Sequence, residues 1–319
     1  MDPQVALQAV LTGLAQGAVY GLVALGFTLV HRLVRVLSFA HGDLVVTAVF
    51  VGVLVTVGRT PVVTTPGVAS ALVQVLATLL VGTALSVGLY LLAVRPFLHR
   101  TRGASSAVAG WVAATLAVGL LLREGLGLVF TREAYAVADP LRLDRLVGRD
   151  GVVGLPGDVT VPSRVFGVVV VGALAALAVD RWVARSRTGV ALRAVADDAE
   201  TAALMGIPTE RVVLLAFAVA GLLAGLAGLL SAPAGRATVS AGAILGLKAA
   251  AAALLGRLGS LRGAVVAGLA LGVVESLAVN STALGPAYAD VLALGVLVVV
   301  LAARPEGLRS GAVAAVTAE

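Results

Sequence analysis

The sequence predicts an all-α polytopic membrane protein with about eight or nine transmembrane helices, one of them short or re-entrant, and a cytosolic coupling helix. Three observations support this fold class. Charged residues make up 13% of the 319 residues, which is about half the share usual in soluble domains, and the mean hydropathy is +1.06. Stretches of about 20 or more residues without Asp, Glu, Lys or Arg recur along the chain, which is the length a membrane-spanning helix needs.

Nine apolar segments are expected to form the membrane part. In chain order they are 7–30, 43–58, 66–94, 104–122, 165–183, 212–232, a shorter one near 241–256, 263–281 and 286–303. The first is too long for a signal-peptide core and precedes further spans, so we expect it to remain as a helix. Whether the count is eight or nine depends on whether 241–256 crosses or re-enters. We expect residues 1–319 to form a single transmembrane domain.

The distribution of arginines predicts the orientation. Arg32, Arg35 and the loop 95–102 carry positive charge without acidic residues, so both are expected in the cytosol. The loop of about 123–164 has six Arg and six acidic residues and is expected outside. The polar segment of about 184–211 then returns to the cytosol. This assignment places the N-terminus outside and the C-terminus in the cytosol.

Small residues at a spacing of four predict close helix packing. In lipid, helices associate by close contact, which faces of small residues permit. The glycines in question are Gly13, Gly17 and Gly21 in the first segment, Gly221 and Gly225 in the sixth, and Gly268 and Gly272 late in the chain.

The stretch SRTGVALRAVADDAETAALMGIPTERV, Ser186 to Val212, interrupts the apolar pattern with a polar helix. We expect Thr188 to cap a helix over 189–205, Gly206 to end it, and Thr209 to cap the next helix. The expected apolar face consists of Leu192, Val195, Ala199, Ala202 and Ala203, with Arg193, Asp197, Asp198 and Glu200 on the other sides. Such a helix suits docking in a groove of another protein; the alternative is an ordinary amphipathic loop helix.

A few polar groups within or beside the spans are candidates for the translocation pathway. Lys248 and Glu275 either face each other or extend to opposite interfaces. His41, in the turn SFAHGD with Phe39, either lines an inner gate or caps the second helix. Tyr20 either presents its hydroxyl to the pathway or fills a gap in the bundle.

No pattern typical of an enzyme is found in the sequence. The three histidines, His31, His41 and His99, lack metal-ligand spacing, and no Ser–His–Asp grouping is suggested. No phosphate-binding loop of the G-x-x-x-x-G-K-[ST] type is present. We therefore expect neither catalytic nor metal-binding residues and no cofactor in this chain. The pI near 10.6 is explained by cytosolic loops, because no basic helix or aromatic platform indicates nucleic-acid binding.

Four stretches in this order resemble the permease family of ABC importers for branched-chain amino acids. They are GLAQGAVYGLVALGFTLVHRLVRVLSFAHGD from Gly13, TGVALRA with the following AALMGI from Thr188, GLKAAAAALLGRLGSLRGAVVAGLALGVVESL from Gly246, and RPEGL from Arg304. The third differs from the family pattern, because Ala250 replaces an aromatic residue and Arg257 replaces the second glycine of a pair. These differences bear on the substrate more than on the fold.

The resemblance implies a role and a set of partners. Members of this family pair with a second, related permease, two cytosolic ATPases that bind ATP and Mg²⁺, and an external substrate-binding protein, in the plasma membrane of a bacterium or archaeon. The implied ATPase-coupling residues are Thr188, Gly189, Leu192, Arg193, Asp197, Asp198, Ala202 and Gly206. The implied cargo is leucine, isoleucine, valine or a related hydrophobic amino acid. Alternatives are a permease of the same type for urea or short-chain amides, and an ion-coupled secondary transporter, for which Glu275 alone offers an intramembrane acid.

Overall fold

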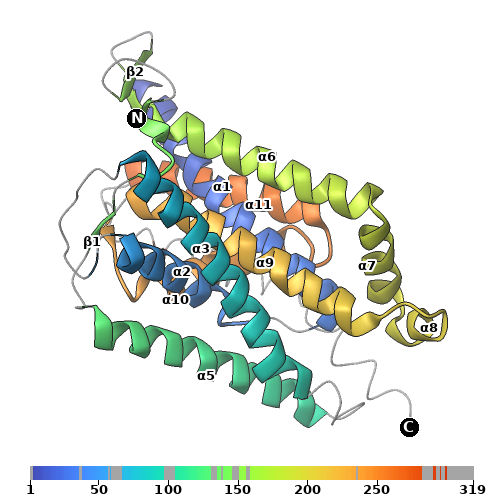
Figure 1. Cartoon of the computed structure of the whole chain (residues 1–319). Helices are drawn as coiled ribbons and strands as arrows, with labels where there is room; N and C mark the ends of the chain where they lie inside the picture. The colour runs from blue at the N-terminus through green and yellow to red at the C-terminus, as the bar shows by residue number, and fades with distance from the viewer. Residues whose placement is uncertain are drawn as a thin grey trace.

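The fold is a bundle of α-helices with short strands at one end, seen here in a computed structural model (Figure 1). The structure describes residues 3–35, 38–56, 58, 67–96, 105–130, 135–137, 139–145, 151–155, 159–234 and 236–281, together with 290, 291, 295 and 299.

The helices follow the apolar segments of the sequence, because a backbone in lipid must satisfy its own hydrogen bonds. They are α1 (Pro3–Val34), α2 (His41–Thr56), α3 (Val68–Leu89), α5 (Ser105–Val129), α6 (Arg164–Arg185), α7 (Arg187–Asp197), α8 (Ala199–Leu204), α9 (Thr209–Ser231), α10 (Ala241–Leu255) and α11 (Leu261–Ser281). A π-helical turn, Tyr90–Val94, extends α3, and two 3₁₀ turns lie at Leu143–Arg145 and Ala232–Ala234.

Six of the described helices are long and apolar enough to cross a membrane: α1, α3 with its π-helical extension, α5, α6, α9 and α11. Two more apolar helices are shorter, α2 with 16 residues and α10 with 15. The expected last span, 286–303, lies outside the described residues apart from 290, 291, 295 and 299. The chain is therefore a multi-pass membrane protein, and α10 is the short segment that the sequence indicates.

The helix α1 connects the two ends of the molecule. With 32 residues it is about 48 Å long. Near its start the Gln8 side chain donates to the carbonyl of Thr160 at 3.3 Å, and just after its end Arg35 donates to the carbonyl of Ala196 at 3.1 Å. The segment before α6 and the start of α1 thus share one end, and α7 lies at the other (Figure 1).

The expected external loop begins later than 123. Arg123 and Glu124 belong to α5, which continues to Val129; in its last turn Leu126 is buried, whereas Leu128 is 91% exposed. Phe130 contacts the rings of Phe50 and Tyr135, with centroids 4.8 and 5.5 Å apart. Strand β1 (Tyr135–Ala136) then pairs with β4 (Arg236–Ala237), and β2 (Val152–Leu155) forms an antiparallel hairpin with β3 (Val159–Pro162).

Two antiparallel helix pairs pack through glycines. A Cβ atom at Gly17 would lie 2.6 Å from Cα of Leu269, so α1 and α11 meet backbone to backbone. In the second pair, α3 and α9, a Cβ atom at Gly221 would lie 2.6 Å from Cβ of Ser86 and one at Gly225 2.9 Å from the carbonyl oxygen of Thr78. The structure places every glycine singled out in the sequence in one of these two seams: Gly13, Gly17, Gly21, Gly268 and Gly272 in the first, Gly221 and Gly225 in the second.

Candidate functional sites

The polar segment between α6 and α9 folds as two helices, and its first cap is Ser186. The Ser186 hydroxyl accepts a hydrogen bond from the amide of Gly189 at 2.9 Å, so Thr188 is not the cap that the sequence suggests. Gly189 is required by the sharp turn, because a Cβ there would lie 2.6 Å from the carbonyl oxygen of Trp182. Arg193 donates to the carbonyl of Val183 near the end of α6. Gly189 and Arg193 therefore build the α6–α7 turn.

The expected single helix over 189–205 is interrupted at Asp198. This residue leaves the helical conformation, with φ −150° and ψ 104°, and its carboxylate accepts from the amides of Glu200 and Thr201 at 2.9 and 3.1 Å. The Thr201 hydroxyl also donates to it at 2.6 Å. Asp198 is thus the N-cap of α8. Hydrogen bonds from the Thr201 hydroxyl and amide and from the Glu200 amide lower the pKa of the Asp198 carboxyl below its usual 3.8.

The end of α8 agrees with the sequence pattern. Gly206 has φ +82°, its amide donates to the carbonyl of Ala203, and the amide of Ile207 donates to that of Ala202, both at 3.0 Å. These two bonds form the Schellman motif, in which glycine is favoured at the left-handed position. Thr209 is the first residue of α9, with Pro208 before it, and makes no side-chain cap.

Three residues of the expected apolar face pack onto the rest of the chain, whereas Ala199 and Ala203 are exposed. Leu192, Val195 and Ala202 are only 1%, 3% and 5% exposed. The reason is that α7 folds back against α1, α6 and α9, where burial of its apolar stripe is favourable. Leu192 and Ala202 therefore hold the segment in place; the docking of this segment on another protein stays a prediction.

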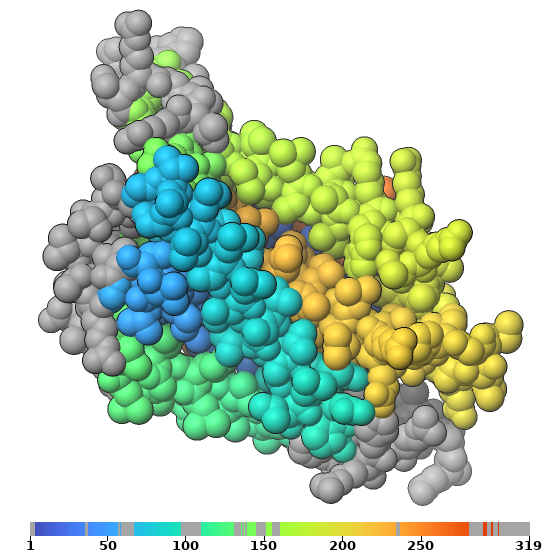
Figure 2. All heavy atoms as spheres, in the orientation of Figure 1, coloured from blue at the N-terminus to red at the C-terminus, as the bar shows by residue number. Residues whose placement is uncertain are grey.

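The outward surface is formed by other residues. Leu204 and Met205, at the tip of α8, are 83% and 78% exposed, and Asp197 and Glu200 of the same segment are also exposed. Of the residues expected to contact an ATPase, Thr188, Asp197, Asp198 and Gly206 are exposed. Figure 2 shows α8 projecting from the molecule beyond α7 and α9. A large apolar pair on a projecting tip is typical of a contact surface.

Lys248, Glu275 and Tyr20 form a buried polar cluster between α1, α10 and α11. Lys248 Nζ lies 2.7 Å from Glu275 Oε1 and 3.4 Å from the Tyr20 hydroxyl. The two charged residues are 5% and 4% exposed, so they face each other and do not extend to opposite interfaces. Asp290, whose side chain is half exposed, lies 2.8 Å from Lys248 Nζ and completes the cluster.

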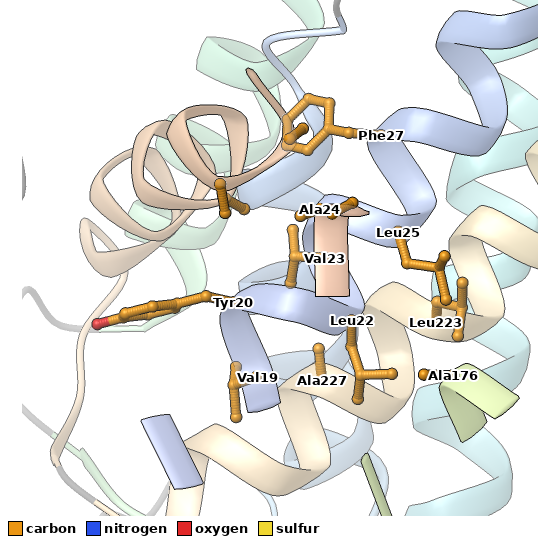
Figure 3. Close-up of a cluster of buried hydrophobic side chains, with 14 of the residues drawn as sticks. Val19, Tyr20, Leu22, Val23, Ala24, Leu25, Phe27, Ala176, Leu223 and Ala227 are labelled. Atoms are coloured by element: carbon orange, nitrogen blue, oxygen red, sulfur yellow. The ribbon is translucent and has the colours of Figure 1, made fainter. Parts of the chain in front are cut away.

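The tyrosine reaches this cluster from the apolar core. Figure 3 shows Tyr20 pointing its ring and hydroxyl away from the side chains of Leu22 and Leu25, which pack with Leu223 of α9. The Lys248 ammonium also lies 5.6 Å from the centre of the Tyr20 ring, within the range of a cation–π contact. One face of α1 therefore packs in the hydrophobic core, and another face contributes Tyr20 to the charged cluster.

Phe39 and His41 lie apart from this cluster, at the start of α2. Phe39 is 39% exposed, whereas His41 is 3% exposed and its ring is 4.8 Å from that of Phe27. Neither Nε2 of His41 nor Oδ1 of Asp43, both buried, has a hydrogen-bond partner among the described residues. The start of α2 meets the start of α10 here, because a Cβ at Gly242 would lie 2.7 Å from that Asp43 oxygen. Two short helices thus meet with their N-terminal ends inside the protein.

Sequence reasoning missed several of these residues. Ser186 was a possible cap by its residue type, since serine is as good an N-cap as threonine. Asp290 lies within the expected last span, 286–303, and no spacing rule connects it with Lys248. The exposure of Leu204 and Met205 depends on which face of α7 and α8 the body covers, which local periodicity does not determine.

Comparison with known proteins shows what this chain is similar to. Residues 9–301 match the family model described as branched-chain amino acid transport system / permease component. The chain is 28% identical over 307 residues to the high-affinity branched-chain amino acid transport system permease protein LivH of Escherichia coli K12, covering 95% of this chain and 94% of the relative.

Two further relatives have similar names. The permease protein BraD of the high-affinity branched-chain amino acid transport system of Pseudomonas aeruginosa is 28% identical over 307 residues, covering 95% of each chain. A probable branched-chain amino acid transport permease protein LivH of the archaeon Methanocaldococcus jannaschii is 26% identical over 295 residues, covering 90% of this chain and 87% of the relative. The similarity thus extends over nearly the whole length of the chain.

Proposed function

The chain belongs to the family of branched-chain amino acid transport permease components, and on that premise we propose that it is the membrane subunit of a binding-protein-dependent ABC importer. Its cargo is leucine, isoleucine, valine or a related hydrophobic amino acid. ATP is hydrolysed on separate cytosolic ATPase subunits that hold ATP and Mg²⁺, and a second permease completes the membrane part. The observation that carries this proposal is the family match over residues 9–301.

The projecting α7–α8 segment is the proposed coupling element. Its buried face ties it to α1, α6 and α9, and its exposed tip, Leu204 and Met205, is free to enter a groove on an ATPase. The spanning helix α9 begins at Thr209, three residues after Gly206. Because this connection is short, a displacement of α8 is expected to move α9 as well. Asp197 adds an exposed charge to the same segment.

We propose that the cluster of Tyr20, Lys248 and Glu275 holds together the helices that surround the pathway. An ionised group in the bilayer interior is unfavourable by roughly 2.5–3.5 kcal/mol on insertion scales, so its presence there requires a partner or a function. Here the ion pair holds the short helix α10 between α1 and α11. His41 at the meeting point of α2 and α10, with Phe39 on the turn before it, is the proposed inner boundary of the pathway.

Uptake of radiolabelled leucine tests the transport proposal. It is measured in cells with and without this gene, with competition by isoleucine, valine, alanine and urea. Loss of leucine uptake in the deletion, together with competition by valine in the intact cells, is the expected result. Unchanged leucine uptake with loss of urea or amide uptake would instead assign the alternative substrate class.

The coupling proposal is tested at the tip of α8. Leu204→Glu is expected to reduce co-purification of the ATPase and leucine uptake, while leaving the yield of membrane-inserted protein unchanged. Val152→Glu, at an exposed position of the β2–β3 hairpin at the opposite end, is the matched control. Full ATPase binding by the Leu204 variant would contradict the coupling role.

The proposed orientation has a direct test, because the chain contains no cysteine. A single cysteine at Val152 should react with a membrane-impermeant maleimide in intact cells. A single cysteine at Leu204 should react only in inverted vesicles. The reverse pattern would overturn the assignment of the N-terminus to the outside.

A further inference from the structure

An open cavity of about 620 Å³ lies at the end of the molecule that carries α7, on the side of Arg193 and away from the tip of α8. Its walls are the ends of α1 and α6, one side of α7, and the turn between α10 and α11. A second cavity of about 280 Å³ shares Arg32, Arg193 and Gly259 with it and extends toward Arg35 and Asp197.

The main cavity is strongly basic. Arg32, Arg193, Arg257 and Arg262 line it, and Asp180 is the only acid among the described residues of its wall. Arg262 pairs with Asp180 at 3.0 Å, whereas the guanidinium groups of Arg32 and Arg193 donate to backbone carbonyls. Within the described ranges, the Arg257 side chain has no hydrogen-bond or ion-pair partner. Four guanidinium groups therefore converge on this cavity, against two acidic residues: Asp180 in its wall, and Asp197 near Arg32 in the adjoining cavity.

Arg257 reaches the cavity in an unfavourable backbone conformation. It follows Gly256, the C-cap of α10, and has φ +64°, the left-handed region that favours glycine. Glycine would relax this backbone, so an arginine here points to a requirement for its side chain. That side chain is exposed at the wall of the cavity.

The helices beside the cavity are apolar and exposed. Leu174 and Leu177 on α6 are 60% and 46% exposed, and Leu177 lies one turn before Asp180. On α11, Val266 is 64% exposed and lies one turn after Arg262. In a membrane protein such faces meet acyl chains or another helix. The charged cavity therefore sits where an apolar surface ends.

We propose that this cavity binds a phosphate group, supplied by the headgroup of an anionic phospholipid whose acyl chains lie along α6 and α11. Guanidinium groups form paired hydrogen bonds with phosphate oxygens, and basic pockets between spanning helices bind anionic headgroups. Arg257 supplies the unpaired cation, and Arg32 and Arg193 hold the floor of the cavity in shape. This site is independent of the transport proposal, because its test measures binding and not uptake.

The test uses quenching of tryptophan fluorescence by brominated lipid. The chain has two tryptophans, and Trp182 adjoins the cavity residue Val183. Delipidated Trp111→Phe protein in detergent is titrated with brominated phosphatidylglycerol or brominated phosphatidylcholine. Phosphatidylglycerol should quench at a lower mole fraction. Inorganic phosphate and glycerol phosphate, added as competitors, distinguish a lipid source of the phosphate from a soluble one.

Two substitutions of Arg257, with a control substitution of Arg211, test whether the cavity is the binding site. Arg257→Gln should weaken the preference for phosphatidylglycerol about fivefold, since one basic residue near an anionic surface contributes about 1 kcal/mol. Arg211→Gln, an exposed arginine at the same end but outside the cavity, should leave it unchanged. Arg257→Gly should raise the melting temperature while weakening the preference to the same extent as Arg257→Gln.

Three outcomes are distinguished. A phosphatidylglycerol preference that Arg257→Gln reduces, without competition by soluble phosphate, supports the site with a lipid source. Displacement by millimolar glycerol phosphate supports the phosphate site with a soluble source. Equal quenching by both lipids, or equal effects of the two arginine-to-glutamine variants, overturns the proposal. If Trp111→Phe fails to fold, the rise in melting temperature of the unmodified chain on adding each lipid provides the same comparison.

Discussion

Removing Lys248 should destabilise the protein much more than neutralising Glu275, although the two form one ion pair. With an effective dielectric constant of about 20, charges 2.7 Å apart attract by about 6 kcal/mol, most of which is offset by loss of hydration. Lys248→Met leaves Glu275, only 4% exposed, without a cation, and unpairing a buried ion is unfavourable by about 3–5 kcal/mol. Glu275→Gln leaves the ammonium with Asp290 at 2.8 Å and an amide oxygen, so about 1–2 kcal/mol is expected.

The assay is reversible unfolding of the purified protein in mixed micelles, followed by circular dichroism as the fraction of denaturing detergent rises. The double variant Lys248→Met/Glu275→Met should lose less than the sum of the two single methionine variants, because it leaves no unpaired charge. For transport, Lys248→Glu should abolish uptake, and adding Glu275→Lys should restore part of it. Additive losses, or equal losses for Lys248→Met and Glu275→Gln, would refute the pairing as the reason for these residues.

Three further predictions concern packing and the α7–α8 segment. Gly17→Leu should prevent α1 and α11 from closing and should lower the melting temperature and the yield of monodisperse protein, whereas Gly88→Leu, with no atom within 4 Å of an added Cβ, should not. Ser186→Ala should reduce stability by about 1 kcal/mol through loss of the α7 cap, measured by the same unfolding assay. Because the pKa of Asp198 is depressed, its cap should stabilise α8 fully above pH 3.8 and lose effect as the pH falls through the lower folded value. A spin label at Leu204→Cys should become more mobile over that range, and in an Asp198→Ala background it should be mobile at every pH; identical pH profiles with and without Asp198 would contradict this.

The spanning helices could be predicted from the sequence because lipid imposes a simple rule. A segment that crosses the bilayer must be long, apolar and internally hydrogen-bonded, and these properties are local. The segment predicted at 212–232 is α9 at Thr209–Ser231, and 263–281 is α11 at Leu261–Ser281. The glycine spacings likewise indicate packing faces, although only the structure shows that Gly17 meets α11.

The coupling segment was less predictable, since its form depends on contacts with the rest of the chain. Both Asp197 and Asp198 are compatible with a helix interior, and nothing local shows that Asp198 becomes a cap. The apolar stripe with Leu192 was predicted to dock on another protein, whereas Leu192 packs against the chain's own helices, and amphipathicity does not distinguish the two. For the buried cluster, the scarcity of charge in the spans singles out Lys248 and Glu275, whereas the contact of Asp290 with Lys248 depends on how the expected last span packs.

The glycine seams restrict how this protein changes shape. Backbones that touch at Gly17 and Gly221 leave no side-chain layer to slide on, so α1 and α11 move as one rigid body and α3 and α9 as another. If the chain transports as proposed, we expect its opening to occur by rotation between these two pairs, where larger side chains such as Leu22 and Leu223 pack together. We therefore expect the proposed gate between the pairs, where α2 and α10 lie, and not within either pair.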